Sequence, residues 1–379
     1  MHNRFRVLSI VSALLVSLVA GSTAFGQDKK GAPPKVDKAY QAEIAAAIKI
    51  VDDALKGQAA PSDYKFSFTG HPMKGQGTKT FIPFLISFEK GQTLPPSAVY
   101  YLRIVSKENL EKAQKAIAEH DAAVQKAAMA AKLEPDNAEL ADAEEKIRAE
   151  APKVEYAFED LKNVGFNKPK LDTDFRLPAA MMVAPGTYDA YILIKEPAAS
   201  VKNKKVPAKA GLLKVALTVP NYATDELTTS TLIVTNMVAV LKAPPSAAEL
   251  AANPYIFGST AVTPSLVDRF AKADDLTVFF FIYNTGLDKA TGKPDVSVDY
   301  NFYTKTGTTE KFFNKTDPLQ WNAKTLPPNF DAKGGFVIPG TQTIPLGSFP
   351  EGDYRLEIKI TDKVAGKTKI ENVRFTVTP

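Results

Sequence analysis

Polar and apolar positions alternate most strictly near the C-terminal end of the sequence. Within residues 352–361, one face of an extended chain would carry only apolar side chains, those of Tyr354, Leu356, Ile358 and Ile360. The charged residues between them would lie on the opposite face. Turn-forming residues follow at positions 362–367, and a second alternating run begins after them. The pattern predicts a β-hairpin whose apolar face covers a core.

The second run of this hairpin changes its phase. Val373, Phe375 and Val377 are odd-numbered, whereas Ile370 is even-numbered, so a regular strand cannot place all four on one face. Either Ile370 is exposed, or a β-bulge between Ile370 and Val373 shifts the register by one residue. We expect the bulge.

A helical period replaces the alternation close to the N-terminal end. Apolar residues recur there at spacings of mostly three and four, at Val36, Tyr40, Ile44, Ala47, Ile48, Val51 and Leu55. Gly57 follows as a C-terminal stop signal. The spacing predicts an amphipathic helix of about five turns. Its apolar stripe must lie on the first β-domain or on a partner protein.

The alternation typical of strands begins at Pro61 and is interrupted between residues 106 and 151. The interruption is rich in Ala, Lys and Glu, and apolar or small residues recur at helical spacing on both sides of Pro135. Asp136 follows the proline and is a good helix N-cap. We expect a helical hairpin inserted between two strands. Because its seam residues are small, they bury little area, and the hairpin should be the least stable part of the chain.

These patterns divide the chain into four parts. Residues 1–26 form a signal peptide, and residues 27–60 form a disordered leader followed by the amphipathic helix. Residues 61–222 form a first β-domain that contains the hairpin of residues 106–151, and residues 223–379 form a second one. Strands at this spacing, with turn signals between them, favour antiparallel sandwiches. The predicted fold class is mainly β, with two immunoglobulin-like antiparallel β-sandwiches.

The first 26 residues have the features of an export signal. Arg4 and Arg6 precede an apolar stretch of 14 residues, at positions 7–20, whereas a bilayer span needs about 20. Small residues at positions 24 and 26 suit cleavage before Gln27, and no cysteine follows for lipid attachment. We therefore expect an exported protein, in the periplasm or outside the cell, without a membrane span.

Composition excludes several classes of function. The chain contains no cysteine, which removes disulfides, thiolate catalysis and cysteine-ligated metal together. The formal net charge is +5, and it falls by two, to +3, when Arg4 and Arg6 are removed with the signal peptide. Such a weak and dispersed charge does not favour nucleic acid as a partner.

Four stretches resemble a family of bacterial secreted proteins of uncharacterised function. They are residues 79–84 (KTFIPF), 225–230 (DELTTS), 279–284 (FFFIYN) and 349–359 (FPEGDYRLEIK). Similar β-modules lie at the C-terminal ends of GWxTD-domain proteins, although this chain has no GWxTD motif. The resemblance covers about residues 61–377 without the helical insertion. It implies immunoglobulin-like sandwiches and export, and it brings no activity, cofactor or catalytic residue.

Candidate catalytic residues are sparse. His71 lies in a loop rich in Gly and Lys, and His120 lies on the helical seam; neither is near a serine motif or a second metal ligand. Two pairs of carboxylates are close in sequence, Asp172 with Asp174 and Asp288 with Asp295. Such pairs can hydrolyse glycosides or bind calcium, but they are usually turn residues. We predict no catalytic residue, no metal site and no cofactor.

Two groups of aromatic residues are candidate contact surfaces. Phe279, Phe281 and Tyr283 form a second apolar face on one strand, which is either covered on both faces or exposes an aromatic interface. The other group is Tyr303, Phe313 and Trp321, close to the loops that follow this strand. These side chains either fill the core or form a platform on which a sugar ring stacks.

A loop rich in lysine is a third candidate surface, and its lysines are Lys202, Lys204, Lys205 and Lys209. They either contact an anionic polymer or lipid headgroups, or are simply solvated. From all these features we predict an exported, non-enzymatic binding or scaffolding protein with a protein partner. A protein that binds a carbohydrate or an envelope polysaccharide is the alternative, and an enzyme with an unrecognised site is the third choice.

Overall fold

The computed structural model describes residues 38–149, 156–166, 171, 175–201, 204–331 and 336–379. Strands predominate in these residues and form mainly antiparallel sheets, which confirms the predicted mainly-β class. The predicted signal peptide and the leader up to residue 37 lie outside the described residues.

The chain forms two compact units. Unit 1 comprises Met1–Phe68, Leu85–Leu177 and Gly186–Val219. Unit 2 comprises Thr69–Phe84, Pro178–Pro185 and Pro220–Pro379. Two strands, β3 (Thr80–Phe88) and β6 (Phe175–Val183), have residues in both units.

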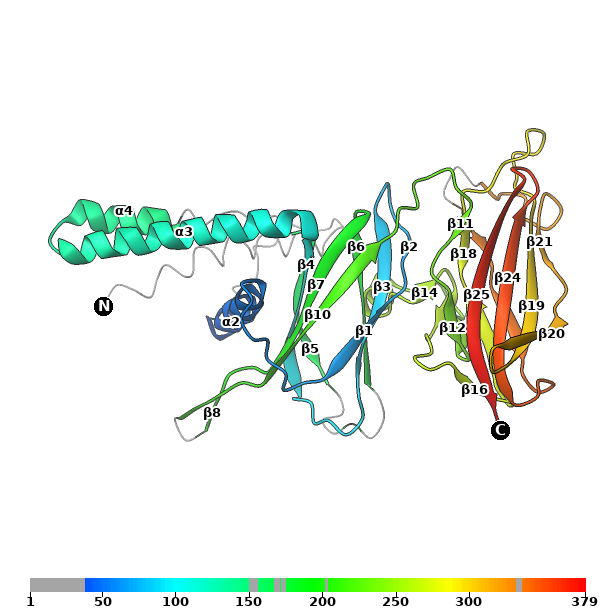
Figure 1. Cartoon of the computed structure of the whole chain (residues 1–379), viewed down its shortest axis with the longest axis horizontal. Coiled ribbons are helices and arrows are strands. Elements are labelled where there is room, and N and C mark those ends of the chain that lie inside the picture. The colour runs from blue at the N-terminus through cyan, green and yellow to red at the C-terminus, as the bar shows by residue number, and fades with distance from the viewer. Residues whose placement is uncertain (1–37, 150–155, 167–170, 172–174, 202–203, 332–335) are drawn as a thin grey trace. The chain divides into compact units, whose positions relative to one another are not determined.

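The main sheet of unit 1 has four antiparallel strands in the order β10, β7, β4, β5 (Figure 1). Their bounds are β10 (Ala210–Val219), β7 (Gly186–Lys195), β4 (Ser97–Ser106) and β5 (Phe158–Gly165). Eight consecutive residues of β4 are buried, so this strand is covered on both faces. One of them is the charged Arg103.

Helix α2 (Lys38–Leu55) covers one face of this sheet. Its buried side chains form one cluster with residues of the strands: Ala47, Val51, Leu55, Val99, Tyr101, Val105, Tyr191, Leu193 and Ala210. The predicted amphipathic helix is therefore confirmed, and its apolar stripe lies on the first β-domain.

A second sheet contains β1 (Phe66–Gly70), β2 (Met73–Lys74), β3 and β6, with β3 paired to each of the others. Four phenylalanines of unit 1 form successive ring contacts, with centroids 5.4 to 6.2 Å apart: Phe66, Phe88, Phe166 and Phe175. Between β7 and β10, β8 (Ala199–Val201) and β9 (Lys204–Val206) form a long hairpin.

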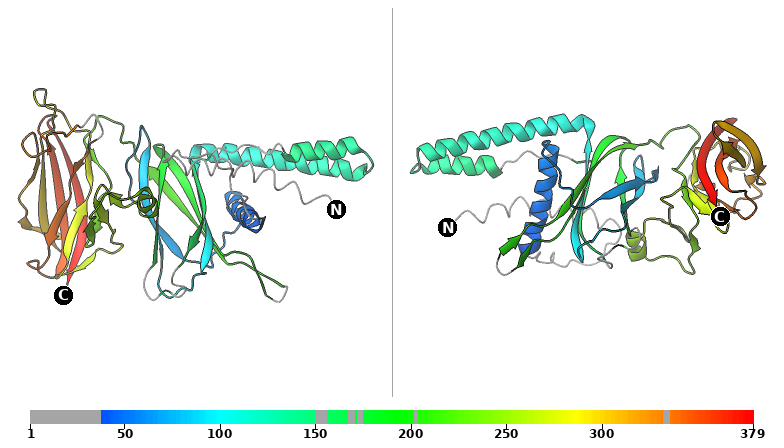
Figure 2. Two further views of the ribbon diagram at one scale, coloured as in Figure 1. Left: turned by 180° about the vertical axis from the view of Figure 1, so that it is seen from behind. Right: turned by 60° about the horizontal axis from the view of Figure 1, so that its bottom comes forward.

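The predicted helical hairpin lies between β4 and β5. It consists of α3 (Lys107–Leu133) and α4 (Ala138–Ala149), which run side by side away from the main sheet (Figures 1 and 2). Its N-cap differs from the prediction: the Asn137 side chain, rather than that of Asp136, accepts a hydrogen bond from the amide of Glu139, at 3.2 Å. No helix in the described part of the chain is long and apolar enough to cross a membrane.

Unit 2 contains a six-stranded sheet in the order β16, β25, β24, β19, β20, with β21 also paired to β19. The bounds are β16 (Arg269–Ala271), β19 (Val296–Thr306), β20 (Thr309–Lys315), β21 (Leu319–Trp321), β24 (Gly352–Asp362) and β25 (Lys367–Thr378). Strand β16 is parallel to β25, and the other pairs are antiparallel.

Two three-stranded sheets supply the opposite part of the core of unit 2. One contains β11 (Thr228–Thr229), β18 (Phe281–Tyr283) and β22 (Ile338–Pro339), and the other contains β12 (Ile233–Thr235), β17 (Asp275–Phe279) and β23 (Gln342–Pro345). Leu276, Val278 and Ile282 from these sheets join Tyr300 and Ile358 of the six-stranded sheet in one buried cluster.

The hairpin of β24 and β25 has the predicted register on its first strand. Its four apolar residues, Tyr354, Leu356, Ile358 and Ile360, are at most 2% exposed. The expected β-bulge in the second strand is wrong. The ladder is uninterrupted, with Lys359 opposite Ile370 and Leu356 opposite Val373, and Ile370 is 50% exposed. The regular ladder keeps every backbone pair, and a single exposed isoleucine is common on protein surfaces.

A small sheet of unit 2 follows β12 in the chain. It contains β13 (Val238–Val240), β15 (Thr260–Val262) and β14 (Ile256–Phe257), in that order. Helix α5 (Ala247–Ala252) lies between β13 and β14 in sequence, and Ser246 and Glu249 form a capping box at its start.

Candidate partner-binding site

The aromatic row of Phe279, Phe281 and Tyr283 is mostly buried within unit 2. Phe279 and Tyr283 are 5% and 4% exposed, and Phe281 is half-buried. The ring of Phe257 stacks on Phe279 at 4.8 Å, and Tyr222 meets Tyr283 edge-on at 5.3 Å. Other segments of unit 2 therefore cover this second face. The row does not form a free aromatic interface.

Tyr303, Phe313 and Trp321 do not come together as a platform. Trp321 lies opposite Val296, and Tyr303 lies opposite Phe312, so seven residues of β19 separate the two positions. At about 3.3 Å per residue, this separation is about 23 Å. Phe313 and Trp321 pack against the core of unit 2. The predicted sugar-stacking surface is therefore not assembled.

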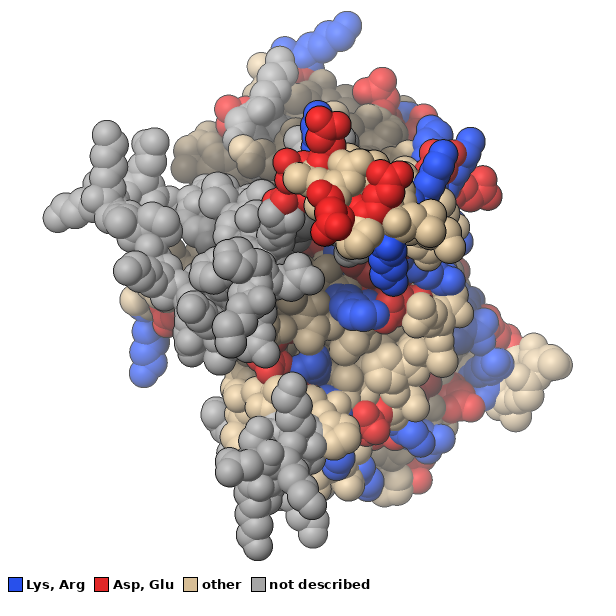
Figure 3. Space-filling view, turned by 90° about the vertical axis from the view of Figure 1, so that its left-hand side faces the viewer, with Lys and Arg blue, Asp and Glu red and all other residues tan. Residues whose placement is uncertain are grey.

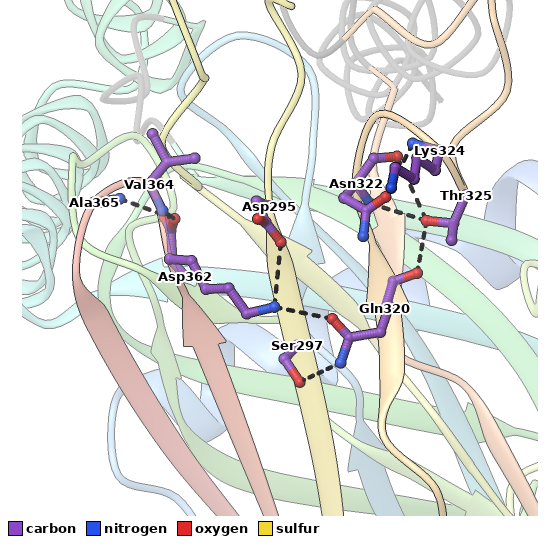
Figure 4. A network of polar contacts seen from close by, with 10 residues as sticks. Asp295, Ser297, Gln320, Asn322, Lys324, Thr325, Asp362, Val364 and Ala365 are labelled. Carbon is purple, nitrogen blue, oxygen red and sulfur yellow. Dashed lines mark hydrogen bonds and ion pairs between the residues drawn. The ribbon is translucent and has the colours of Figure 1, made fainter.

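A polar network includes Gln320, which precedes Trp321 in β21 (Figure 4). Gln320 donates a hydrogen bond from Nε2 to Ser297 Oγ at 2.8 Å. Lys363 donates to Gln320 Oε1 at 3.0 Å, and its Nζ lies 3.4 Å from a carboxylate oxygen of Asp295. Each of these groups has a local partner, so the network ties β21 to β19 and to the turn after β24.

The other candidate residues also have local roles. Asp288 accepts hydrogen bonds from Thr291 in its own loop, which lowers the pKa of Asp288. His120 donates from Nε2 to the carbonyl oxygen of Ile147 at 2.8 Å, across the seam of α3 and α4. Three candidates, Asp172, Asp174 and Lys202, lie outside the described residues, and Lys204 and Lys205 are placed by their backbone in β9.

His71 is buried in unit 2, at 7% exposure. Its Nδ1 lies 2.8 Å from the hydroxyl of Tyr255. Burial lowers the pKa of His71 to about 4, so the ring is neutral at pH 7. Within the described ranges, no group of three His, Cys, Asp or Glu side chains could hold a metal ion.

The helical hairpin is fixed to unit 1 at its base. Leu110 packs against the cluster beneath α2, and Gln114 donates to the carbonyl oxygen of Leu55 at 2.7 Å. Further along α3, Asp121 pairs with Lys56 at 2.9 Å. The hairpin therefore contacts α2 and the sheet as well as packing α3 against α4. Leu110 and Gln114 make these contacts near the start of α3, and the Lys56–Asp121 ion pair beyond them is exposed to solvent.

Arg103 lies beneath α2 and is 2% exposed. Its guanidinium donates to Asp52 on α2 and, at 2.9 Å, to Glu159 on β5, and it lies 3.9 Å from the centroid of the Tyr156 ring. Burial alone would lower the pKa of Arg103, but Tyr101, Tyr156 and the two carboxylates raise it overall. The group therefore stays charged and joins the helix to two strands.

A second ion pair holds the first half of α2. Lys195, at the end of β7, pairs with Glu43, which also accepts a hydrogen bond from the amide of Ala198 at 2.8 Å. Glu43 and Asp52 are nine residues apart, or about 13 Å along the helix. Breaking a buried pair leaves an uncompensated charge. The two pairs therefore fix the position of α2, and α2 in turn supports the base of α3.

The far end of the hairpin exposes two apolar side chains. We call residues 129–142 the hairpin tip. Met129 is 70% exposed and Leu133 is 80% exposed. Because they are four residues apart, they lie on the same face of α3. From Asp121 to Leu133 the helix rises about 18 Å, so the tip stands well beyond the supported base.

The hairpin tip is also acidic. It contains one lysine, Lys132, and four carboxylates, those of Glu134, Asp136, Glu139 and Asp142. Its formal charge of 1 − 4 = −3 is opposite in sign to the +5 of the whole chain. Acidic side chains predominate at the end of the hairpin in Figure 3. The tip thus combines exposed apolar side chains with negative charge.

The sequence does indicate this surface, through two large apolar residues that lie outside the predicted seam. The helical spacing in the sequence places Ala127 and Ala131 in the small seam of the predicted hairpin, and Met129 and Leu133 follow them by two positions each. Two residues correspond to about 200° around a helix, so the longer side chains lie on the opposite face from the small ones. Two large apolar residues on one exposed face of α3 make this face a candidate contact surface.

Comparisons with known proteins do not identify a family. No protein-family model matches the sequence, and no curated protein matches it. Similar solved structures include Escherichia coli α-2-macroglobulin activated by porcine elastase, at 9% identity and a TM-score of 0.19, and red sea bream transglutaminase, at 8% and 0.19. The alignments cover 84% of this chain in both cases, but only 24% and 32% of those proteins. The chain thus spans about a quarter to a third of their length.

Proposed function

We propose that this chain is an exported, non-enzymatic binding or scaffolding protein that docks a protein partner on the hairpin tip. In this proposal two immunoglobulin-like β-sandwiches are the scaffold, and residues 1–26 direct the chain to the periplasm or the outside of the cell. The observation that carries the proposal is the exposure of Met129 and Leu133, 70% and 80%, at the end of a hairpin with a fixed base.

The fixed base favours binding because it reduces the entropy that association must overcome. Gln114 and Asp121 hold α3 against α2, and α2 is itself held by Arg103 and Lys195. These contacts restrict the orientation of α3 relative to the sheet of unit 1. If the tip were on a flexible tether, binding would have to restrict the motion of that tether. The resulting loss of conformational entropy would lower the net affinity of the same contacts.

The partner that fits this surface has an apolar patch with lysine or arginine around it. Fully burying a side chain of the Leu or Met class contributes about 1.5–3 kcal/mol. The four carboxylates of the tip would face the basic rim of the partner, where charge complementarity speeds encounter and excludes wrong partners. An envelope polysaccharide has less support, because Tyr303, Phe313 and Trp321 are not assembled and an acidic tip repels anionic polymers.

The proposal is tested by photo-crosslinking in the extracytoplasmic fraction of the source cells. A photoreactive amino acid replaces Leu133 in one variant and Lys115 in another. Lys115 is the matched control, because it is exposed on the same helix, nearer the base. We expect a discrete protein adduct from position 133 and not from position 115. Equal adducts from both positions, or none from position 133, would exclude the tip as a docking site.

Charge and apolar contacts are then separated in the crosslinking variant. Met129→Ala tests the apolar contact, and it preserves the helix because alanine has the highest helix propensity. Glu139→Gln with Asp142→Asn removes two charges at nearly constant shape. We expect both changes to reduce the adduct, and added salt to reduce it further in the variant that retains all its carboxylates. If the yield of the adduct does not change with these charges or with added salt, the partner does not have the proposed basic rim.

A further inference from the structure

Strand β13 of unit 2 forms one edge of the small sheet. It pairs with β15 on one side, and among the described residues no strand pairs with its other side. The pairing is antiparallel, with Val238 opposite Val262 and Val240 opposite Thr260. The edge therefore offers backbone groups that another strand can use.

The backbone hydrogen bonds show which groups are free. Met237 accepts a hydrogen bond from the amide of Thr263 at 3.0 Å, and Leu241 donates to the carbonyl oxygen of Ser259 at 2.7 Å. In an antiparallel ladder, alternate residues direct both of their backbone groups to the same neighbour. The odd-numbered residues thus face β15. The N–H and C=O groups of Val238 and Val240 point away from the sheet.

The side chains along this edge are apolar and exposed. Met237, Val238 and Val240 are 60%, 40% and 77% exposed, and Ala239 is exposed as well. No charged residue lies between Asn236 and Leu241. Proteins usually protect exposed edge strands with charges, prolines or bulges. Within β13 this edge has none of them, which favours a strand of equally neutral and apolar character as its partner.

The edge is held rigidly from within unit 2. The hydroxyl of Thr235 accepts from the amide of Met237 at 2.8 Å and donates to the carbonyl oxygen of Thr263 at 2.5 Å. Val262, behind β13, is 2% exposed, and its amide donates to the carbonyl oxygen of Tyr255 at 3.0 Å. Pairing at this edge therefore requires little additional ordering.

We propose that β13 pairs antiparallel with β13 of a second copy of this chain. With Ala239 opposite Ala239 of the second copy, Val238 of each chain lies opposite Val240 of the other. Every outward N–H and C=O group of the two strands then has a partner. The same three residues serve both sides, as a twofold interface requires. The contact joins the two small sheets into one continuous sheet and covers Val240.

The absence of cysteine in the chain makes a direct test possible. In this register the two Ala239 residues form a non-hydrogen-bonded pair, with Cα atoms about 4.5 Å apart, within the range of a disulfide. The two Val240 residues are offset by two positions along the strands, so they lie about 7–8 Å apart. Under mild oxidation we expect the Ala239→Cys protein to form a disulfide-linked dimer quickly and the Val240→Cys protein to form one slowly.

Random collision predicts no preference for Ala239→Cys, because both positions are exposed. Faster crosslinking of Val240→Cys, or equal rates, would therefore overturn the register. Absence of crosslinking from both variants would overturn the pairing. If the true partner of β13 is a different protein, the purified protein should remain monomeric. That result would contradict pairing with a second copy of this chain.

Sedimentation of the full-length mature protein provides a test without cysteine. Val240→Pro removes an outward N–H but no hydrogen bond to β15. We expect concentration-dependent dimers of the wild-type protein and a dissociation constant raised by about tenfold or more in Val240→Pro. Val240→Lys should act in the same direction, whereas Ile370→Lys, at an exposed position of β25, should not. A monomeric wild-type protein, or equal dissociation constants, would overturn the proposal.

Discussion

Strands β4 of unit 1 and β24 of unit 2 both lie between two neighbours in their sheets, but their second faces have different surroundings. Eight consecutive residues of β4 are buried, because α2 covers the face that the core does not. On β24 buried residues alternate with accessible ones. A covering helix thus turns a surface face into a second core, and any charged residue on that face must find its partners inside the protein.

Two arginines show the consequence. Arg103 on β4 is 2% exposed and contacts Asp52 and Glu159. Arg355 on the outer face of β24 also contacts two carboxylates, at 2.7 and 3.1 Å, but its side chain is 16% accessible. The same chemistry therefore operates in two environments. A buried pair contributes little net stability but is costly to break, whereas water replaces a lost partner at the surface.

The largest effect is expected for Arg103→Ala. The change leaves Asp52 and Glu159 without their shared cation beneath α2, and breaking a buried pair typically costs about 3–5 kcal/mol. Arg355→Ala should cost less, because the Arg355 side chain is already 16% accessible to water, compared with 2% for that of Arg103. Hydrogen exchange of the amides of β4 and β7 measures the loss for Arg103→Ala, and that of β24 and β25 measures the loss for Arg355→Ala; denaturant unfolding followed by circular dichroism compares the two. If the two substitutions lower the free energy of unfolding equally, then burial beneath α2 does not increase the cost of losing the arginine.

A third variant separates charge from packing at this position. Arg103→Met keeps much of the volume but not the charge, and Asp52→Asn combined with it removes one of the two unpaired carboxylates. If electrostatics dominate, the double variant should be more stable than Arg103→Met alone. The opposite order would assign the effect to the packing of the guanidinium on Tyr156.

The apolar face of β24 should be the next most sensitive. Ile358 is fully buried, and truncation of such a residue to alanine typically costs about 2–5 kcal/mol. Lys359→Ala, one position along and exposed, should stay within about 0.5 kcal/mol of the wild type. Trp321 is the only tryptophan of the chain and lies in unit 2, so its fluorescence follows the relevant unfolding. A larger loss for Lys359→Ala would place the strand one residue out of register.

His71 should make the stability of unit 2 sensitive to acid. Its pKa is lowered to about 4, compared with about 6.5 in the unfolded chain, so between these values only the unfolded chain binds the proton. The contribution of the neutral His71 to the free energy of unfolding is therefore fully present above about pH 6.5. It is lost as the pH falls towards 4, by up to about 3 kcal/mol. His71→Gln should reduce this loss, and Trp321 fluorescence at neutral pH and near pH 4 measures it.

Tyr255→Phe is the control for this prediction. It removes the hydrogen bond to His71 but leaves the imidazole buried, so the loss of stability on acidification should persist. If His71→Gln and the wild type lose the same stability between neutral pH and pH 4, the carboxylates rather than His71 cause the acid sensitivity.

The same contrast explains what the sequence predicts well. The alternation around Ile358 predicts its register, because one face of β24 meets a core and the other meets water. The stripe on α2 predicts a helix that needs a surface to cover. Neither pattern identifies the partners of Arg103, since Asp52 and Glu159 are 51 and 56 residues away in sequence and meet only in the folded chain.

The hairpin tip and the edge of β13 were not predicted, for a related reason. The seam of α3 explains its small residues, and the exposure of Met129 and Leu133 depends on which face α4 covers. Apolar residues near Val238 look like an ordinary strand in sequence. Only the pairing of the small sheet leaves one side of β13 open. Surfaces for partners therefore depend on what the fold leaves uncovered.

The smallest expected effect concerns Ile370, where the expected bulge is wrong. Ile370→Thr keeps a β-branched side chain at a position that is 50% exposed, so it should change the free energy of unfolding by about 0.5 kcal/mol or less. Val373→Thr places a hydroxyl at a position that is 8% exposed, and burying an unpaired hydroxyl costs about 1–3 kcal/mol. The pair is matched, because both changes put threonine into β25 three residues apart. If Ile370→Thr is the more destabilising change, β25 has the bulged register after all, with Ile370 in the core.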